Sequence, residues 1–211
     1  WGLADRAAFD ALIKAGHADP AHADYAKGIF AETALMAAVG KMRPYLVTPE
    51  LIQRGMGEMK RMMLASGVTT VSDMATGVFA SFDVEAGLIK AAFERSDNPS
   101  RLMLMPMASQ VATDVELDGW YNAMKGKWSS PHIRVDRRVK MLADGAFFAQ
   151  NMMMNPPGYI DGHQGKWITP PDVVTSQFRR FWEAGFSLHI HVNGDMGLDV
   201  VLDGLNPLSQ R

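Results

Sequence analysis

Two histidines one residue apart, His189 and His191, stand in the segment FSLHIHVNGDMGLDVVLDGL at residues 186–205. Imidazole nitrogens are common ligands of divalent metal ions, and they also donate or accept hydrogen bonds in catalytic sites. If the segment begins with a strand, alternation places both histidines and Asn193 on one face and the apolar residues between them on the other. A wholly polar face on a strand between two helical segments indicates that this face lines a site.

A lysine in the segment RVKMLADG is the second candidate for chemistry. Alternation places Lys140 and Asp144 on one face of a strand, opposite Val139 and Met141. Burial of a lysine is unfavourable unless the amine is paired, deprotonated or chemically modified. A lysine carboxylated by carbon dioxide offers two oxygens to metal ions, whereas a deprotonated lysine could form a Schiff base. The residues alone leave a metal ligand, a buried ion pair and a Schiff base open.

Four polar residues are expected to support the site without binding a metal. We expect His189 and Asn193 to hydrogen-bond a metal ligand or the substrate. Asp144 ends a strand, where it either orients Lys140 or begins the turn. Asp195 precedes the helical pattern MGLDVV, so it faces the site or caps that helix.

Strands and helices alternate along most of the chain and would position these residues. Thr48 and Pro49 are typical of a helix start, and β-branched residues follow Gly67 directly. Strands are expected over 68–74, 101–107, 133–144 and 186–194, and helices over 48–66, 83–96, 115–124 and 169–185. This order predicts an α/β fold with parallel strands, in an open sheet or a barrel. Residues 1–47 show no strand period, and we expect helices and loops there.

Composition limits the class of protein. The chain has 211 residues, of which 47% are hydrophobic, and 21 basic against 23 acidic residues give a formal net charge of -2. No basic run predicts binding to nucleic acid or an anionic membrane, and a small molecule is the expected partner. No apolar run approaches the roughly 20 residues that span a bilayer. The chain has no cysteine, so thiolate metal sites are excluded, and a cytoplasmic location is expected.

Three segments, GVTTVSDM, RVKMLADGAF and LHIHVNGDMGLDVVLDGL, resemble in their order and separation the YtcJ-like branch of the metal-dependent amidohydrolase superfamily (amidohydrolase family 3). KGIFAETA resembles the segment preceding the helical insert of that branch. The most specific elements are His191-x-x-Gly194-Asp195 and Lys140-x-x-x-Asp144-Gly, and the resemblance spans roughly residues 27–205. It implies part of a (β/α)₈ TIM-type barrel, about strands 2 to 5, over residues 48–211. Residues 1–47 would belong to an insert or small accessory domain.

The resemblance also implies an activity and a cofactor. Lys140, in carboxylated form, and His191 match metal ligands of the fourth and fifth strands, for one or two divalent ions, with zinc expected. The implied activity is hydrolysis of non-peptide C–N bonds in small amide-like substrates by a metal-activated water. The chain departs from the pattern, because the first-strand His-x-His is missing and the sixth-strand histidine and general-base aspartate would lie beyond Arg211. The alternative is a non-catalytic half-barrel fragment, stable only with a second copy or a complementary fragment.

Overall fold

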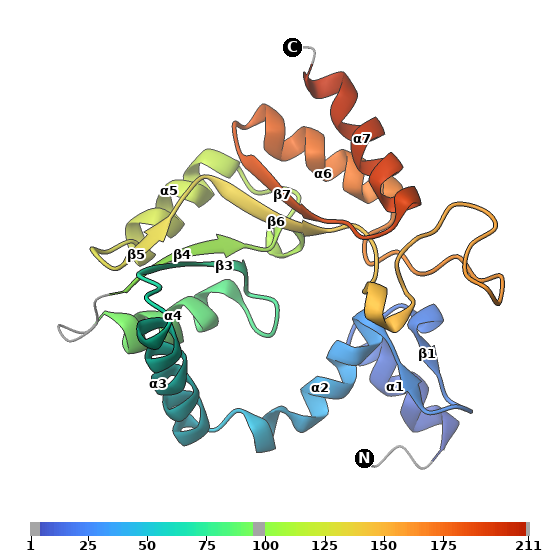
Figure 1. Cartoon of the computed structure of the whole chain (residues 1–211), viewed down its shortest axis with the longest axis horizontal. Helices are drawn as coiled ribbons and strands as arrows, with labels where there is room; N and C mark the ends of the chain where they lie inside the picture. Colours follow the sequence, from blue (N-terminus) through green and yellow to red (C-terminus); the bar gives the residue numbers. More distant parts are fainter. Residues whose placement is uncertain (1–4, 95–99, 210–211) are drawn as a thin grey trace.

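Parallel strands and helices alternate in the computed structural model, which describes residues 5–94 and 100–209 (Figure 1). The strands that carry the candidate residues and their neighbours are β3 (Thr70–Thr76), β4 (Arg101–Pro106), β5 (Ile133–Val135), β6 (Arg138–Leu142) and β7 (Ser187–His191). The helices that follow residue 48 are α3 (Pro49–Ala65), α4 (Phe82–Phe93), α5 (Leu117–Trp128), α6 (Pro171–Glu183) and α7 (Asp195–Ser209). The prediction of an α/β fold with parallel strands is confirmed.

The parallel strands form two sheets, with the order β3-β4-β5 in one and β6-β7 in the other. The prediction of one strand over 133–144 is wrong, because the chain turns between β5 and β6. The backbone N–H of Arg138 donates to the carbonyl of Asp136 at 2.8 Å, so the chain forms a tight local turn there. A parallel bridge between Met107 and Lys140 joins the two sheets.

The strands do not close into a barrel over the described ranges. β3 pairs there with β4, and β7 pairs with β6, and neither is recorded with a second neighbour. The expected (β/α)₈ barrel of about strands 2 to 5 therefore stays a prediction.

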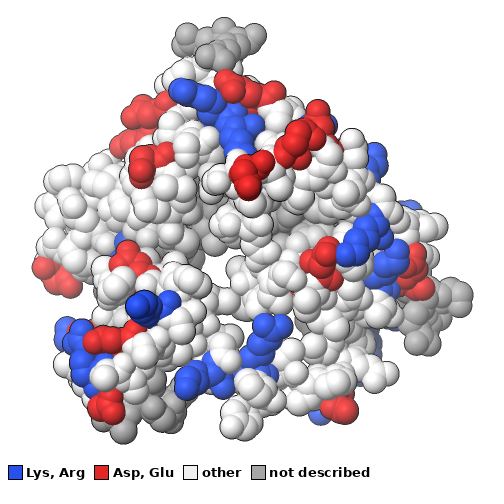
Figure 2. All heavy atoms as spheres, turned by 180° about the vertical axis from the view of Figure 1, so that it is seen from behind, with Lys and Arg blue, Asp and Glu red and all other residues white. Residues whose placement is uncertain are grey.

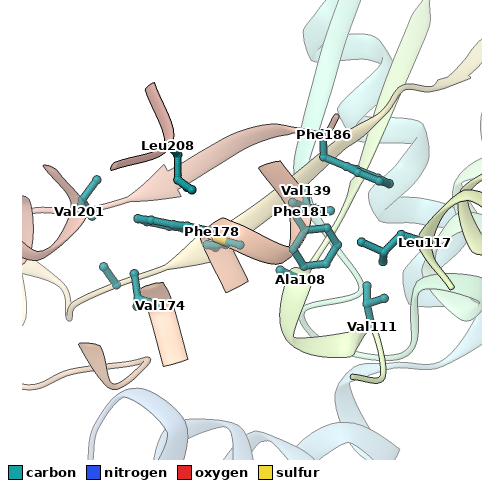
Figure 3. Close-up of a cluster of buried hydrophobic side chains, with 12 residues drawn as sticks. Ala108, Val111, Leu117, Val139, Val174, Phe178, Phe181, Phe186, Val201 and Leu208 are labelled. Atoms are coloured by element: carbon teal, nitrogen blue, oxygen red, sulfur yellow. The ribbon is translucent and has the colours of Figure 1, made fainter. Parts of the chain in front are cut away.

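The helices that follow β5 pack their apolar faces on one side of β6 and β7 (Figure 3). Val139 of β6 and Phe178 and Phe181 of α6 are fully buried in this core. Leu188 and Ile190 of β7 pack against the same core. By alternation, Lys140 and the two histidines of β7 lie on the opposite face of the sheet.

A second core lies between α3, α4 and α5 and the side of β3, β4 and β5 that faces these helices. Leu102 and Leu104 of β4 are almost fully buried in it, and Phe93 of α4 is fully buried in the same core. Helix α3 starts as expected, since the hydroxyl of Thr48 accepts the N–H of Leu51 at 3.3 Å.

The N-terminal segment has a small core of its own around Phe9 and Ile13. Its elements are α1 (Arg6–Ala15), η1 (Pro20–His22), β1 (Ala23–Asp24), β2 (Ile29–Phe30) and α2 (Glu32–Leu46). The pair β1-β2 is antiparallel and was not expected, because strands of two residues are too short to show alternation. Figure 1 places this segment beside the turn that follows β6. The assignment of residues 1–47 to a separate domain stays a prediction.

The surface shows no segregation of charge on the face drawn in Figure 2, where acidic and basic side chains are interspersed. Among residues 5–94 and 100–209, no helix has the length and apolar character needed to cross a bilayer.

Candidate functional site

The candidate residues of β6 and β7 form a row on the face that the helices leave uncovered. In the strand register, Lys140 lies opposite His189 and Leu142 lies opposite His191. Register partners in neighbouring strands are about 4.8 Å apart, and their side chains point the same way. The row therefore brings the lysine beside one imidazole, with the second imidazole at the carboxyl end of β7. Active sites of parallel α/β folds commonly lie at this edge.

The electrostatics of the row are dominated by positive charge. Lys140 is half-buried, and burial lowers the pKa of its ammonium group. Within the described part of the chain, no hydrogen bond or ion pair is recorded for its amine. Burial also lowers the pKa of His189, and the positive charges of Arg138 and Lys140 lower it further. At neutral pH the row thus presents one amine without a counter-ion beside a neutral imidazole.

Asp144 follows β6, two residues after Leu142, and is fully buried. Its Oδ1 accepts the backbone N–H of Asn193 at 2.8 Å, and its Oδ2 accepts those of Met153 at 2.9 Å and Gly194 at 2.8 Å. We call this arrangement the Asp144 clamp. It joins the end of β6, the loop that follows it and the turn after β7. The carboxylate thereby fixes the edge of the sheet and makes no recorded bond to Lys140.

Asn193 connects the clamp to His191. Its side-chain Nδ2 donates to the carbonyl of Gly145 at 3.0 Å and lies 2.9 Å from Nε2 of His191. The Gly145 carbonyl can accept a hydrogen bond only from the nitrogen of the Asn193 side-chain amide, so it determines which end of that amide faces Gly145. Nε2 of His191 must then accept the second N–H of that amide, which leaves the ring proton on Nδ1. A metal bound through Nε2 would have to displace this amide.

Asp195 faces the loop 151–155. Its Oδ1 accepts the backbone N–H of Asn155 at 2.8 Å, and this hydrogen bond lowers the pKa of the Asp195 carboxyl group. The same loop passes so close to Gly194 that a Cβ there would lie 1.9 Å from the carbonyl oxygen of Met153. Glycine is required at this position by the close approach of the two backbones.

Glu32 reaches this region from the N-terminal segment and was not among the residues singled out from the sequence. Its Oε1 accepts the N–H of Ala146 at 3.1 Å and the Nδ2 of Asn151 at 2.9 Å. The sequence gives little sign of this contact, because an acidic residue at a helix start is usually explained by the helix dipole. The partners lie 114 and 119 residues further along the chain.

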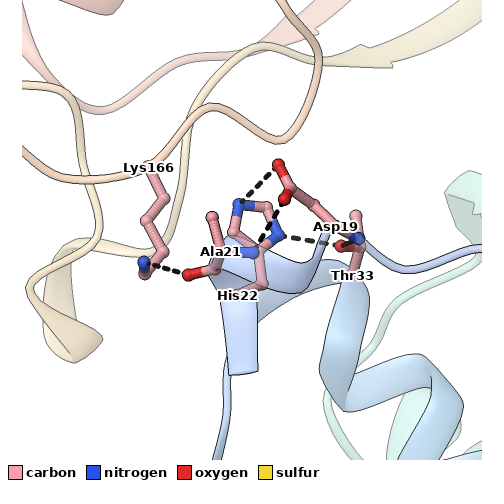
Figure 4. Close-up of polar contacts among 5 residues, drawn as sticks. All are labelled: Asp19, Ala21, His22, Thr33 and Lys166. Atoms are coloured by element: carbon pink, nitrogen blue, oxygen red, sulfur yellow. Dashed lines mark hydrogen bonds and ion pairs between the residues drawn. The ribbon is translucent and has the colours of Figure 1, made fainter. Parts of the chain in front are cut away.

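A second contact attaches the same segment to the loop 165–170 (Figure 4). His22 is buried, and its Nδ1 lies 2.8 Å from the hydroxyl of Thr33, while Lys166 donates to the carbonyl of Ala21 at 2.7 Å. Burial lowers the pKa of His22, against the opposing effect of Asp19. These residues line a groove of about 560 Å³ between the segment and the loop.

The candidate residues offer few donors for a metal ion. Lys140 and His191 share one face on adjacent strands, so both could contribute to one site. Within residues 5–94 and 100–209, however, no group of three or more His, Cys, Asp or Glu side chains could hold a metal. A structural or catalytic zinc ion usually takes at least three protein ligands. The described residues therefore do not complete a zinc site by themselves.

Comparison with known proteins gives the fold. A scan against protein-family models and a search of curated proteins find no match to the sequence. Two solved structures are similar, both uncharacterized metal-dependent hydrolases, one from Pyrococcus furiosus and one from Pyrococcus horikoshii OT3. Their TM-scores are 0.63 and 0.62, at 20% and 19% sequence identity.

The similarity covers 94% of this chain and only 40% and 39% of the two hydrolase chains. This chain thus spans about two fifths of the length of the proteins that it resembles. At this identity the likeness shows a shared fold, which is one found in metal-dependent hydrolases.

Proposed function

We propose that the chain carries part of the active site of a metal-dependent hydrolase of the YtcJ-like amidohydrolase branch. The substrate would be a small molecule with an amide-like, non-peptide C–N bond. The observation that carries the proposal is the half-buried amine of Lys140, which has no counter-ion among residues 5–94 and 100–209 and shares a face with His189 and His191. A lysine in such a position needs a modification or a ligand to compensate for its burial.

Carboxylation would supply that compensation. A lowered pKa leaves a larger fraction of the Lys140 amine unprotonated, which is the form that reacts with carbon dioxide. Lys140 in carboxylated form and His191 would be the ligands that this chain contributes to one or two divalent ions, with zinc as the proposed metal. A bound divalent ion lowers the pKa of its water toward about 7 and polarises a carbonyl oxygen.

The chain's own residues would orient the reacting groups. The Asp144 clamp fixes the backbone at the carboxyl ends of β6 and β7. Without a metal, Asn193 holds the ring of His191 through Nε2, and the amide would release this nitrogen when it binds a metal ion. His189, neutral near pH 7 and opposite Lys140 in the strand register, would hydrogen-bond the carboxylated lysine or the carbonyl oxygen of a substrate. The absence of a recorded carboxylate in this row favours ligands with anionic or carbonyl oxygens.

A second candidate function is that of a non-catalytic half-barrel that associates with a second copy or a complementary chain. The incomplete donor set within the described ranges favours it, as do the outer strands β3 and β7, each of which pairs there with one neighbour. An unpaired strand edge is a ready surface for association. The two candidates make different predictions for metal content.

The deciding experiment is to measure bound metal and amide hydrolysis in the purified protein, together with H191A and K140M variants. We expect both variants to lose metal and turnover together. The matched control is H132N, because Nδ1 of His132 lies 3.2 Å from the carbonyl of Ser100 at the opposite ends of the strands. Metal and turnover at the original levels in H191A would refute the assignment. A metal-free, inactive original protein that elutes as a stable oligomer would favour the half-barrel.

A further inference from the structure

Glu32 has a backbone conformation that its local sequence does not require. Its φ is +43°, in the left-handed region that residues with a side chain rarely adopt. It is also the first residue of α2, where a relaxed helical conformation is available. Strained conformations of this kind persist only where surrounding contacts hold them, and they concentrate at functional sites. The contacts of the Glu32 side chain therefore account for this backbone conformation.

These contacts clamp the turn that follows β6. One oxygen of Glu32 accepts both the N–H of Ala146 and the amide of Asn151, which lie on either side of the turn. Gly145 is packed between them, since a Cβ there would lie 2.8 Å from Oε1 of Glu32 and 2.6 Å from the carbonyl oxygen of Asn151. The position of the Gly145 peptide is thus fixed by the Glu32 carboxylate.

The carbonyl of Gly145 is the group that orients Asn193, whose amide contacts His191. A continuous series of contacts therefore runs from Glu32 through the turn to Gly145, Asn193 and Nε2 of His191. Each step has a direction, because a carboxylate and a carbonyl can only accept and a backbone N–H can only donate. The Ala146 N–H that Glu32 accepts and the Gly145 carbonyl that orients Asn193 belong to the same peptide unit, so Glu32 acts on the acceptor that determines the direction of the Asn193 amide.

We propose that Glu32 is a positioning residue for His191, which it holds in the tautomer with the proton on Nδ1 and the lone pair on Nε2. The N-terminal segment would then contribute a positioning residue to the candidate site, in addition to lying beside it. The importance of this tautomer for hydrolysis rests on the function proposed above, whereas the tautomer itself can be measured without a metal.

The competing explanation is that Glu32 only attaches the N-terminal segment to the rest of the chain. The segment has a second attachment, in which the Thr33 hydroxyl contacts His22 and the backbone N–H of Asp19. Thr33 is the neighbour of Glu32 in α2 and has no recorded bond to the turn after β6. A T33V variant therefore weakens the segment without disturbing the contacts that lead to His191.

The test is to determine the His191 tautomer in the metal-free full chain, labelled with ¹⁵N-histidine, from long-range proton–nitrogen correlation spectra. The His191 signals are assigned by comparison with H191Q. In the original protein we expect protonated Nδ1. The E32A variant should show a mixture of tautomers, whereas E32Q, which retains an acceptor oxygen, should restore the original spectrum. T33V should leave the His191 signals unchanged.

An unchanged His191 spectrum in folded E32A would overturn the proposal, and so would an equal change in T33V. If E32A does not fold, N151A decides the matter, because it removes one of the two bonds to Glu32. It should shift the tautomer population in the same direction but less far, and no shift would refute the role of Glu32. A failure of metal binding in the original protein would refute the proposed hydrolase and leave this result standing.

Discussion

Two carboxylates, Asp144 and Glu85, each accept three backbone N–H groups near the ends of strands, but they do so over different distances in sequence. Glu85 accepts those of Gly77, Phe79 and Ala80, which lie five to eight residues before it in the loop between β3 and α4. Asp144 accepts from residues 9, 49 and 50 positions away. One closes its own loop, and the other joins three separate segments.

The difference relates to where the candidate chemistry lies. A carboxylate that closes a local loop stabilises one connection and leaves the neighbouring strands independent. A buried carboxylate that joins two strand ends and a loop fixes the relative positions of side chains from different elements. The residues with perturbed pKa in the row on β6 and β7, Lys140 and His189, lie on the strands that the Asp144 clamp joins.

The largest expected effect is from removal of the clamp itself. D144A leaves three backbone N–H groups without an acceptor, two of them in fully buried bonds, and we expect it to lower the free energy of unfolding by about 4 kcal/mol. D144N keeps one acceptor oxygen and should lower the free energy of unfolding by about half as much as D144A. Urea denaturation measures both. A loss below about 1 kcal/mol in D144A would mean that the clamp contributes little to stability.

The second prediction tests the close approach that accompanies the clamp. G194A forces a methyl group to within 1.9 Å of the carbonyl oxygen of Met153, and we expect it to lower the free energy of unfolding by about 3 kcal/mol. The matched control is G126A in α5, where an added Cβ meets no atom within 4 Å. Alanine should there stabilise the helix by about 0.5 to 1 kcal/mol. If G194A and G126A changed the melting temperature equally, loop 151–155 would accommodate the added methyl group without a loss of stability.

The third prediction concerns the local carboxylate. E85A should lower the free energy of unfolding by only about 1 to 2 kcal/mol, because the loop that Glu85 closes is partly exposed and water can replace the lost hydrogen bonds. It should also leave the His191 tautomer unchanged, in contrast to D144A. Denaturation combined with the histidine spectra tests both parts. A His191 spectrum altered by E85A would remove the distinction between the two carboxylates.

The smallest expected effect is a pH dependence that comes from the N-terminal attachment. Burial lowers the pKa of His22 below its ordinary value of 6.5, so the unfolded chain takes up this proton first as the pH falls. The folded state should therefore lose stability as the pH falls below 6.5, and gain nothing from this group well above it. Denaturation at pH 7.5 and pH 5 should show a smaller difference in H22Q. If H22Q and the original protein differed equally in stability between the two pH values, the pH dependence would come from groups other than His22.

The sequence predicted the elements whose signals are local. Helix α3 carries its cap and its proline within two residues, and the polar face of β7 follows from alternation alone. The break between β5 and β6 could not be predicted, because Asp136 and Arg137 stand within an otherwise strand-like pattern. Asp136 is a residue type common in turns, but the apolar residues before and after it keep the same alternation phase, which favoured one continuous strand.

The candidate site was predictable in its residues and less so in their contacts. Lys140, His189 and His191 could be placed on one face, because strand alternation depends only on position. The bonds of Asp144 and Glu32 could not be predicted, since their partners become neighbours only when the chain is folded. The ligand roles of Lys140 and His191 stay predictions.

The bridge between Met107 and Lys140 also has a mechanical meaning. Over the described residues it is the backbone pairing recorded between the β3-β4-β5 sheet and the β6-β7 sheet. The sheets are also held together through α5, because Trp120 and Tyr121 pack against both cores. The backbone of Lys140 therefore lies at the junction of the two sheets, and its position depends on the packing of both.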